Sequence, residues 1–174
     1  MNKNLALFLC LSLPALMLMV VPARAETVLL NFEGSISQAG CSVRDAATEP
    51  PVILGRWGTN QFAGDGMSPP VPFTLKLNCP DAKQATITFS GTADSNDNTL
   101  LKIDGGTGVA SGVGIRIEDS NRNPINLASP SAMMTLASGN NDLQFFARYK
   151  ATTSPAVVSV GAANATAQFT LNYQ

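Results

Sequence analysis

The last ten residues, ATAQFTLNYQ (165–174), constrain the fold most, because apolar and polar side chains alternate along them. This period of two is typical of a β-strand with one face on a core and the other in water. The stretch 163–174 has no charge, proline or glycine, the features that usually protect an exposed sheet edge. We therefore predict that another strand covers this terminal strand. Its apolar face comprises Ala165, Ala167, Phe169, Leu171 and Tyr173.

The first 25 residues have the pattern of a secretory signal peptide. Lys3 precedes an uncharged apolar run at 5–21, and Ala-Arg-Ala at 23–25 supplies the small residues of a cleavage site. A membrane anchor is the alternative, but Pro14 interrupts the run, which is close to the minimum length for a span. We expect cleavage after Ala25 (1–25) and export of the remainder as one domain.

Composition argues against several classes of function. The chain contains no histidine, which removes catalytic triads and metal sites built on imidazole. Carboxylates such as Asp97 and Asp104 lie in turn-like stretches, where a solvated surface group is a better interpretation than half of a glycosidase pair. No run of Lys and Arg provides an electrostatic footprint for nucleic acid. We expect neither an enzyme nor a cofactor or metal.

Two cysteines, Cys41 and Cys79, remain after the predicted cleavage. In an exported protein a single pair favours one disulfide, with two buried free thiols as the alternative. The chain-entropy model assigns such a loop, of about 39 residues, roughly 4 kcal/mol of stabilisation.

Short alternating segments separated by turn-rich stretches make up most of the chain after residue 25. Strands are predicted at 72–79, 85–91, 112–119, 143–151, 156–160 and 165–173, after an extended stretch at 28–43. Turn residues gather between them, as in TADSNDNT (92–99) and EDSNRNP (118–124). This regular punctuation is typical of an all-β sandwich.

These segments resemble the subunits of bacterial chaperone–usher fimbriae, the type 1 fimbrial pilin family. The resemblance is strongest in GVGIRIEDSNRNPINL (112–127) and in the closing block LQFFARYKATTSPAVVSVGAANATAQFTLNYQ (143–174). NFEGSISQAGCSV (31–43) is similar to the family's N-terminal extension and first cysteine. FTLKLNCPDAKQATITFSGTAD (73–94) is similar to the region of the second cysteine.

The resemblance implies an incomplete immunoglobulin-like β-sandwich that lacks its last strand and is completed by a donor strand from a neighbouring subunit. By position, 26–37 is the donor-strand extension and 38–174 is the pilin domain. The donor side chains would be Val28, Leu30, Phe32, Gly34 and Ile36. The acceptor edge, which also binds the chaperone, would comprise Phe169, Leu171, Tyr173 and the carboxylate of Gln174.

The partners that the family implies are neighbouring subunits, a periplasmic chaperone and an outer-membrane usher. The contact between subunits is heterologous, so it builds an open head-to-tail filament. The expected location is an extracellular fimbrium on the bacterial surface, reached through the periplasm and serving cell adhesion. The alternative is a minor tip or adaptor pilin that itself binds a glycan or protein receptor of the host.

Overall fold

A computed structural model describes residues 40–44 and 51–174 of the chain. Its described elements are β1 (Ser42–Val43), η1 (Thr59–Phe62), β2 (Val71–Cys79), β3 (Lys83–Ser90), β4 (Leu101–Lys102), β5 (Val113–Glu118), β6 (Pro124–Ile125), β7 (Met134–Leu136), β8 (Gly139–Ala151) and β9 (Gln168–Tyr173). The predicted signal peptide (1–25) and donor extension (26–37) lie outside the described residues, and so do all five predicted donor side chains. Within the described part, no helix is long and apolar enough to span a membrane.

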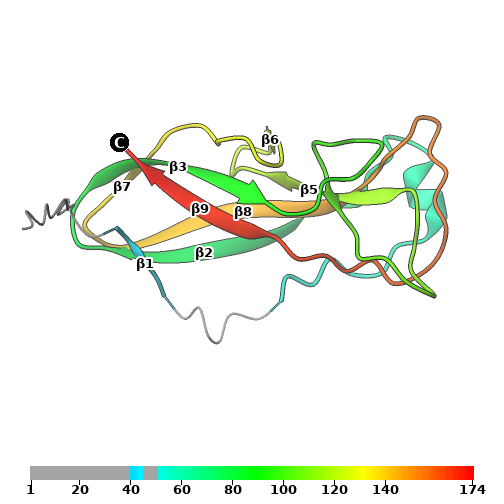
Figure 1. The fold of residues 1–174 in the computed structure, drawn as a ribbon, viewed down its shortest axis with the longest axis horizontal. Helices are drawn as coiled ribbons and strands as arrows, with labels where there is room; N and C mark the ends of the chain where they lie inside the picture. Colours follow the sequence, from blue (N-terminus) through cyan, green and yellow to red (C-terminus); the bar gives the residue numbers. More distant parts are fainter. Residues whose placement is uncertain (1–39, 45–50) are drawn as a thin grey trace, which may run out of the picture. The chain divides into compact units, whose positions relative to one another are not determined.

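The strands form two antiparallel sheets, so the predicted all-β architecture is confirmed. The larger sheet has the order β1-β2-β8-β5-β4, with β6 also paired to β5. The smaller sheet has the order β7-β3-β9. In Figure 1, β3 and β9 lie over β2 and β8, and β9 ends at the C-terminus.

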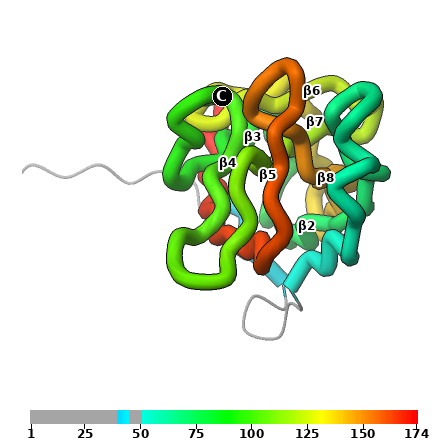
Figure 2. Tube along the Cα trace, turned by 90° about the vertical axis from the view of Figure 1, so that its right-hand side faces the viewer, coloured from blue at the N-terminus to red at the C-terminus, as the bar shows by residue number. Residues whose placement is uncertain are grey.

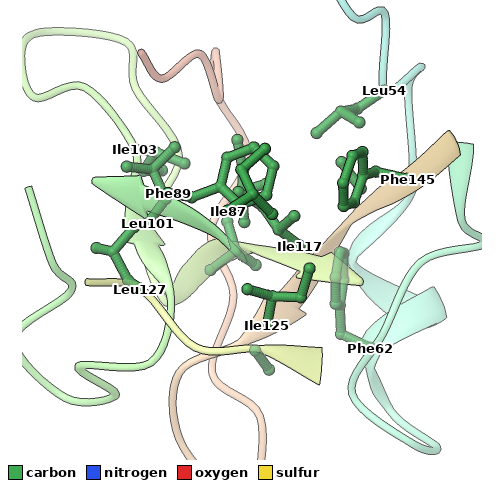
Figure 3. Close-up of a cluster of buried hydrophobic side chains, with 14 residues drawn as sticks. Leu54, Phe62, Ile87, Phe89, Leu101, Ile103, Ile117, Ile125, Leu127 and Phe145 are labelled. Atoms are coloured by element: carbon green, nitrogen blue, oxygen red, sulfur yellow. The ribbon is translucent and has the colours of Figure 1, made fainter. Parts of the chain in front are cut away.

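The core lies between the two sheets, where the apolar residues of each alternating strand meet. In β3, Ala85, Ile87 and Phe89 are almost completely buried, while the residues between them are polar. The Phe89 ring lies edge-on to the Phe145 ring of β8, with centroids 5.4 Å apart. Figure 3 shows both rings within the main buried cluster. Contacts of this kind between side chains of the two inner faces hold a β-sandwich together.

Most predicted strands are confirmed, with small shifts at their ends. The segments 72–79, 85–91 and 112–119 correspond to β2, β3 and β5. The strand predicted at 143–151 begins earlier, at Gly139, because the turn before it is tight enough for pairing with β2 to continue through Cys79. The terminal strand is shorter than predicted, because β9 begins at Gln168.

The prediction of a strand at 156–160 is wrong. This segment makes one isolated antiparallel bridge, between Ser159 and Ser111, and a parallel bridge follows between Ala162 and Val109. A mixed pair of bridges cannot extend into a regular ladder. Figure 2 shows this segment, in orange, running beside the light green segment that contains Val109 and Ser111. The apolar residues that suggested a strand, Val157 and Val160, are largely exposed.

Candidate strand-acceptor edge

β9 lies at the edge of the smaller sheet and pairs on one side only, with β3. Its register places Phe169 opposite Phe89, Leu171 opposite Ile87 and Tyr173 opposite Ala85. Among residues 40–44 and 51–174, no strand pairs with the other side of β9. Phe169, Leu171, Tyr173 and Gln174 are called the β9 edge below. They are the four residues that the sequence predicted as an acceptor.

Burial falls sharply between β3 and the β9 edge, although their inward side chains are direct neighbours. Ile87 is 0% exposed, whereas Leu171 opposite it is only half-buried. Tyr173 is 37% exposed, and its partner Ala85 is 0% exposed. The apolar face of β9 is therefore packed on one flank and uncovered on the other.

The inner face of the larger sheet is also incompletely covered, along β2. β1 pairs only with the end of β2, through Ser42 with Asn78 and Val43 with Leu77. Further along β2, Phe73 is half-buried, and its ring lies 6.3 Å from that of Phe89. The Phe169 ring lies 6.5 Å from the same Phe89 ring. Half-buried rings from the two sheets thus flank one core ring, and an added strand could cover them.

The end of β9 is bonded to the start of the described domain. The Cys41 backbone N–H donates a 2.8 Å hydrogen bond to the phenolic oxygen of Tyr173. Gly40 permits this approach, because a Cβ there would lie 3.0 Å from the Tyr173 ring. The Gln174 backbone N–H donates to the Gln84 carbonyl at 2.9 Å, which continues the pairing with β3 to the last residue.

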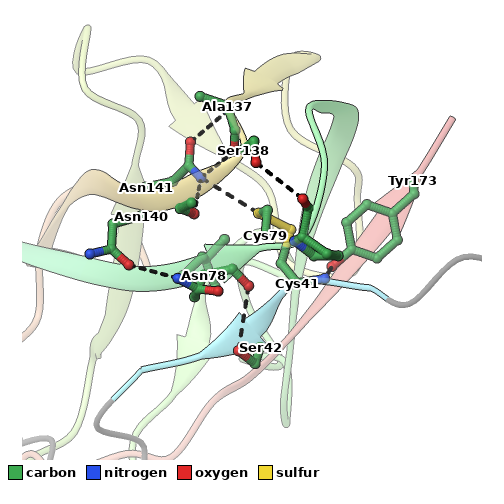
Figure 4. The surroundings of a disulfide bond; sticks show 12 residues. Cys41, Ser42, Asn78, Cys79, Ala137, Ser138, Asn140, Asn141 and Tyr173 are labelled. Atoms are coloured by element: carbon green, nitrogen blue, oxygen red, sulfur yellow. Dashed lines mark hydrogen bonds between the residues drawn. A yellow bond between two sulfur atoms is a disulfide. The ribbon is translucent and has the colours of Figure 1, made fainter.

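The predicted disulfide between Cys41 and Cys79 is present, close to the same end of β9 (Figure 4). Cys79 is 1% exposed and packs with Leu77, Ala85 and Leu136 in a second buried cluster. The disulfide thus links the residue before β1 to the buried end of β2.

The groups with perturbed pKa values are not part of the β9 edge. Burial alone would raise the pKa of Asp97, but hydrogen bonds from Lys150 and Thr99 outweigh it and hold that pKa below its usual value of 3.8. Burial raises the pKa of Tyr149 above its usual 10.0. Within the described residues, no group of three His, Cys, Asp or Glu could hold a metal ion. The chemistry of the β9 edge is backbone pairing and apolar contact.

The comparisons with known proteins agree on one family. The family model described as "Fimbrial protein" matches residues 30–174. The type-1 fimbrial protein, A chain, of Salmonella typhi is 37% identical over 162 residues, covering 88% of this chain and 86% of the relative. The fimbrial subunit type 1 of Salmonella typhimurium is 38% identical over 154 residues, covering 83% and 82%.

Solved structures give the same result. The antigen and type I fimbria protein BPSL1626 of Burkholderia pseudomallei is 39% identical, with a TM-score of 0.59 over 83% of this chain and 96% of that one. The P pilus rod subunit PapA has a TM-score of 0.63 over 78% and 100%, and at 23% identity it shows the shared fold alone. The matched proteins are structural subunits of fimbriae, not enzymes. The chain therefore belongs to the fimbrial protein family.

Proposed function

We propose that this protein is a structural subunit of a chaperone–usher fimbria and that it polymerises by donor-strand exchange. Residues 26–37 of one subunit pair with the β9 edge of the next. The observation that carries this proposal is the one-sided pairing of β9. Its inward side chains are uncovered on the flank where a further strand would be added.

The magnitudes favour a long-lived contact. Burying one large apolar side chain stabilises by about 1.5–3 kcal/mol, so Val28, Leu30, Phe32 and Ile36 together contribute roughly 6–12 kcal/mol. A whole domain is stable by only about 5–15 kcal/mol. Completion by a strand is therefore comparable to the full stability of the subunit, and the polymer should dissociate very slowly.

Assembly of such a subunit needs a partner that protects the β9 edge before polymerisation. A periplasmic chaperone fills this role by supplying a temporary strand, and an outer-membrane usher exchanges it for the arm of the next subunit. The finished polymer lies on the cell surface, where it serves adhesion. Family membership and the fimbrial relatives support this route.

The test compares matched substitutions on the two faces of each strand in cells that also make the chaperone and usher. In the arm, Phe32→Asp places a charge on the inward face, and Asn31→Asp places the same charge on the other. On β9, Leu171→Asp and the exposed Thr170→Asp form the second pair. The readout is the ladder of subunit multimers in surface extracts that resist unheated detergent.

We expect the ladder to be lost in Phe32→Asp and Leu171→Asp and retained in Asn31→Asp and Thr170→Asp. The arm variants are the sharper pair, since they change no residue of the folded domain. An intact ladder in Phe32→Asp would contradict donor-strand exchange through this arm.

A further inference from the structure

Three arginines converge on one buried carboxylate, Glu118, at the end of β5. The Glu118 side chain is 1% exposed, while the arginine side chains are 17–34% exposed. Arg122 is bonded most closely, with Nη2 at 2.6 Å and Nε at 2.7 Å from Oε2. Arg148 donates from Nη2 to the same oxygen at 3.2 Å. The cluster is called the arginine face below: Arg116, Arg122 and Arg148 around Glu118.

Strand pairing and one tight turn bring these residues together. Arg116 of β5 lies directly opposite Arg148 of β8, and Glu118 lies opposite Phe146. Arg122 adopts a left-handed backbone conformation, with φ of 70°, in the turn between β5 and β6. From there its guanidinium returns over the Phe146 ring, 4.5 Å from the centroid. The turn itself holds this conformation, because the Arg122 N–H donates to the Asp119 carbonyl and the Asp119 N–H to the Asn123 carbonyl.

The arginine face carries two positive charges more than Glu118 neutralises. Nε of Arg116 and Nε of Arg148 lie 3.2 and 2.9 Å from Oε1, but without hydrogen-bonding geometry. A further Arg116 nitrogen, Nη1, has the Met67 thioether as its contact, at 4.0 Å. Asp119, the next carboxylate along the chain, instead accepts bonds from Asn121 and Asn123.

We propose that the arginine face binds an acidic surface of a second copy of this chain within the fimbria. The inference rests on the proposed polymer, which brings many copies together. Charge complementarity favours this partner: outside the arginine face the chain has eleven acidic and eight basic residues. The carboxylates of Asp81 and Asp104 are exposed and accept no hydrogen bond or ion pair in the described structure. Asp81 precedes the start of β3, whereas Asp104 lies past its far end, where its N–H donates to the Asn164 carbonyl. One of these two carboxylates is the acidic group that we assign to the contact.

The residue types suit such a contact. Arginine and aromatic side chains are enriched in protein interfaces, and guanidinium groups bind carboxylates through paired hydrogen bonds. Because the arginines are partly exposed, salt should weaken the contact: the screening length falls from about 8 Å at 0.15 M to about 3 Å at 1 M.

The experiment measures the compactness of purified fimbriae by filament width and sedimentation as salt is raised. Wild type is compared with Arg122→Gln, which removes one surplus charge, and with Arg56→Gln, an exposed arginine outside the cluster. We expect wild type and Arg56→Gln to loosen at the same high salt concentration and Arg122→Gln to loosen at a lower one. In charge-reversed Arg122→Asp fimbriae, adding Asp81→Arg or Asp104→Arg should restore compactness.

Several results would overturn the inference. One is an Arg122→Gln fimbria with the width and salt response of wild type. Another is failure of both charge reversals to restore Arg122→Asp. A third is retention on immobilised heparin that depends on Arg122 while compactness does not, which would assign the face to acidic glycans. The detergent-resistant ladder separates this test from the proposed function, because the ladder depends on the arm and β9, not on the arginines.

Discussion

The phenolic oxygen of Tyr173 lies 2.8 Å from the backbone nitrogen of Cys41, 132 positions earlier in the chain. This hydrogen bond joins the last strand to the disulfide. The end of the β9 edge and the start of the folded domain are therefore held in one place.

Tyr173→Phe keeps the ring against Gly40 and removes only this hydrogen bond. We expect the free energy of unfolding to fall by about 0.5–1.5 kcal/mol, the usual net contribution of such a bond. Chemical denaturation of the monomer measures it. Thr170→Ala, exposed on the opposite face of β9, is the matched control and should change the stability little. A Tyr173→Phe protein as stable as wild type would mean that the bond does not hold the strand end.

Loss of the disulfide should be much more severe. The chain-entropy model assigns the cross-link roughly 4 kcal/mol, a large share of the about 5–15 kcal/mol by which whole domains are stable. Cys41→Ser and Cys79→Ser should therefore leave little subunit in the periplasm, as measured by immunoblot. The double variant should resemble each single one. Normal amounts of either single variant, or free thiols in assembled fimbriae, would contradict this prediction.

Glu118 and Arg122 should differ strongly in their effect on stability. Removing the buried carboxylate in Glu118→Ala leaves three like charges together and should cost about 3–5 kcal/mol. Arg122→Gln leaves Glu118 with two arginines and keeps a side chain that can donate a hydrogen bond, so it should cost less than Glu118→Ala. Thermal denaturation of the two variants measures the contrast. Equal losses would mean that Arg122 is required for the fold and is not a surplus charge.

The ion pair of Asp97 with Lys150, 2.8 Å apart, predicts a dependence of stability on pH. The pKa of Asp97 is lowered in the folded protein, so folding favours the ionised carboxylate. The stabilisation that this carboxylate provides is fully present when the pH is above its usual pKa of 3.8, and it is lost as the pH falls through the lowered pKa of the folded protein. Asp97→Asn should thus be less stable than wild type at pH 7, with the difference disappearing in strong acid. A difference that is equally large at pH 2 would refute the assignment.

Alternation of apolar residues predicted the strands of the core because burial enforces it there. Ile87 and Phe89 are buried between polar neighbours, and the same rule placed Leu171 correctly on the inward face of β9. The rule failed at 156–160, where Val157 and Val160 are exposed. A Cβ at Gly112 would clash with the Val157 carbonyl oxygen, so the two backbone segments cross closely there. The periodicity of the side chains gives no sign of this crossing, which positions the segment.

The arginine face could not be predicted from the sequence. Arg116, Arg122 and Arg148 form no cluster along the chain. The pairing of β5 with β8 brings Arg116 and Arg148 together, and the turn after β5 returns Arg122 to the same carboxylate. In contrast, β9 was predictable as a strand, because its alternating apolar and polar residues are already visible in the sequence.

If the β9 edge accepts a strand from another subunit, a strand supplied within the same chain should satisfy it. The variant lacks residues 26–37 and carries, after Gln174, a short flexible linker and a copy of residues 27–37. The appended strand can return antiparallel to β9 and bury its apolar face, since closing a short loop costs far less entropy than joining two molecules. The matched control carries the same appended strand with Phe32→Asp.

The measurement is a thermal melt with size-exclusion chromatography of the variant, its control and the truncated protein without an appended strand. We predict a monomer that needs no chaperone, melts far above both comparison proteins and cannot enter a fimbria. Equal melting temperatures, with all three proteins soluble and monomeric, would mean that the domain is complete without the added strand and that β9 is an ordinary sheet edge.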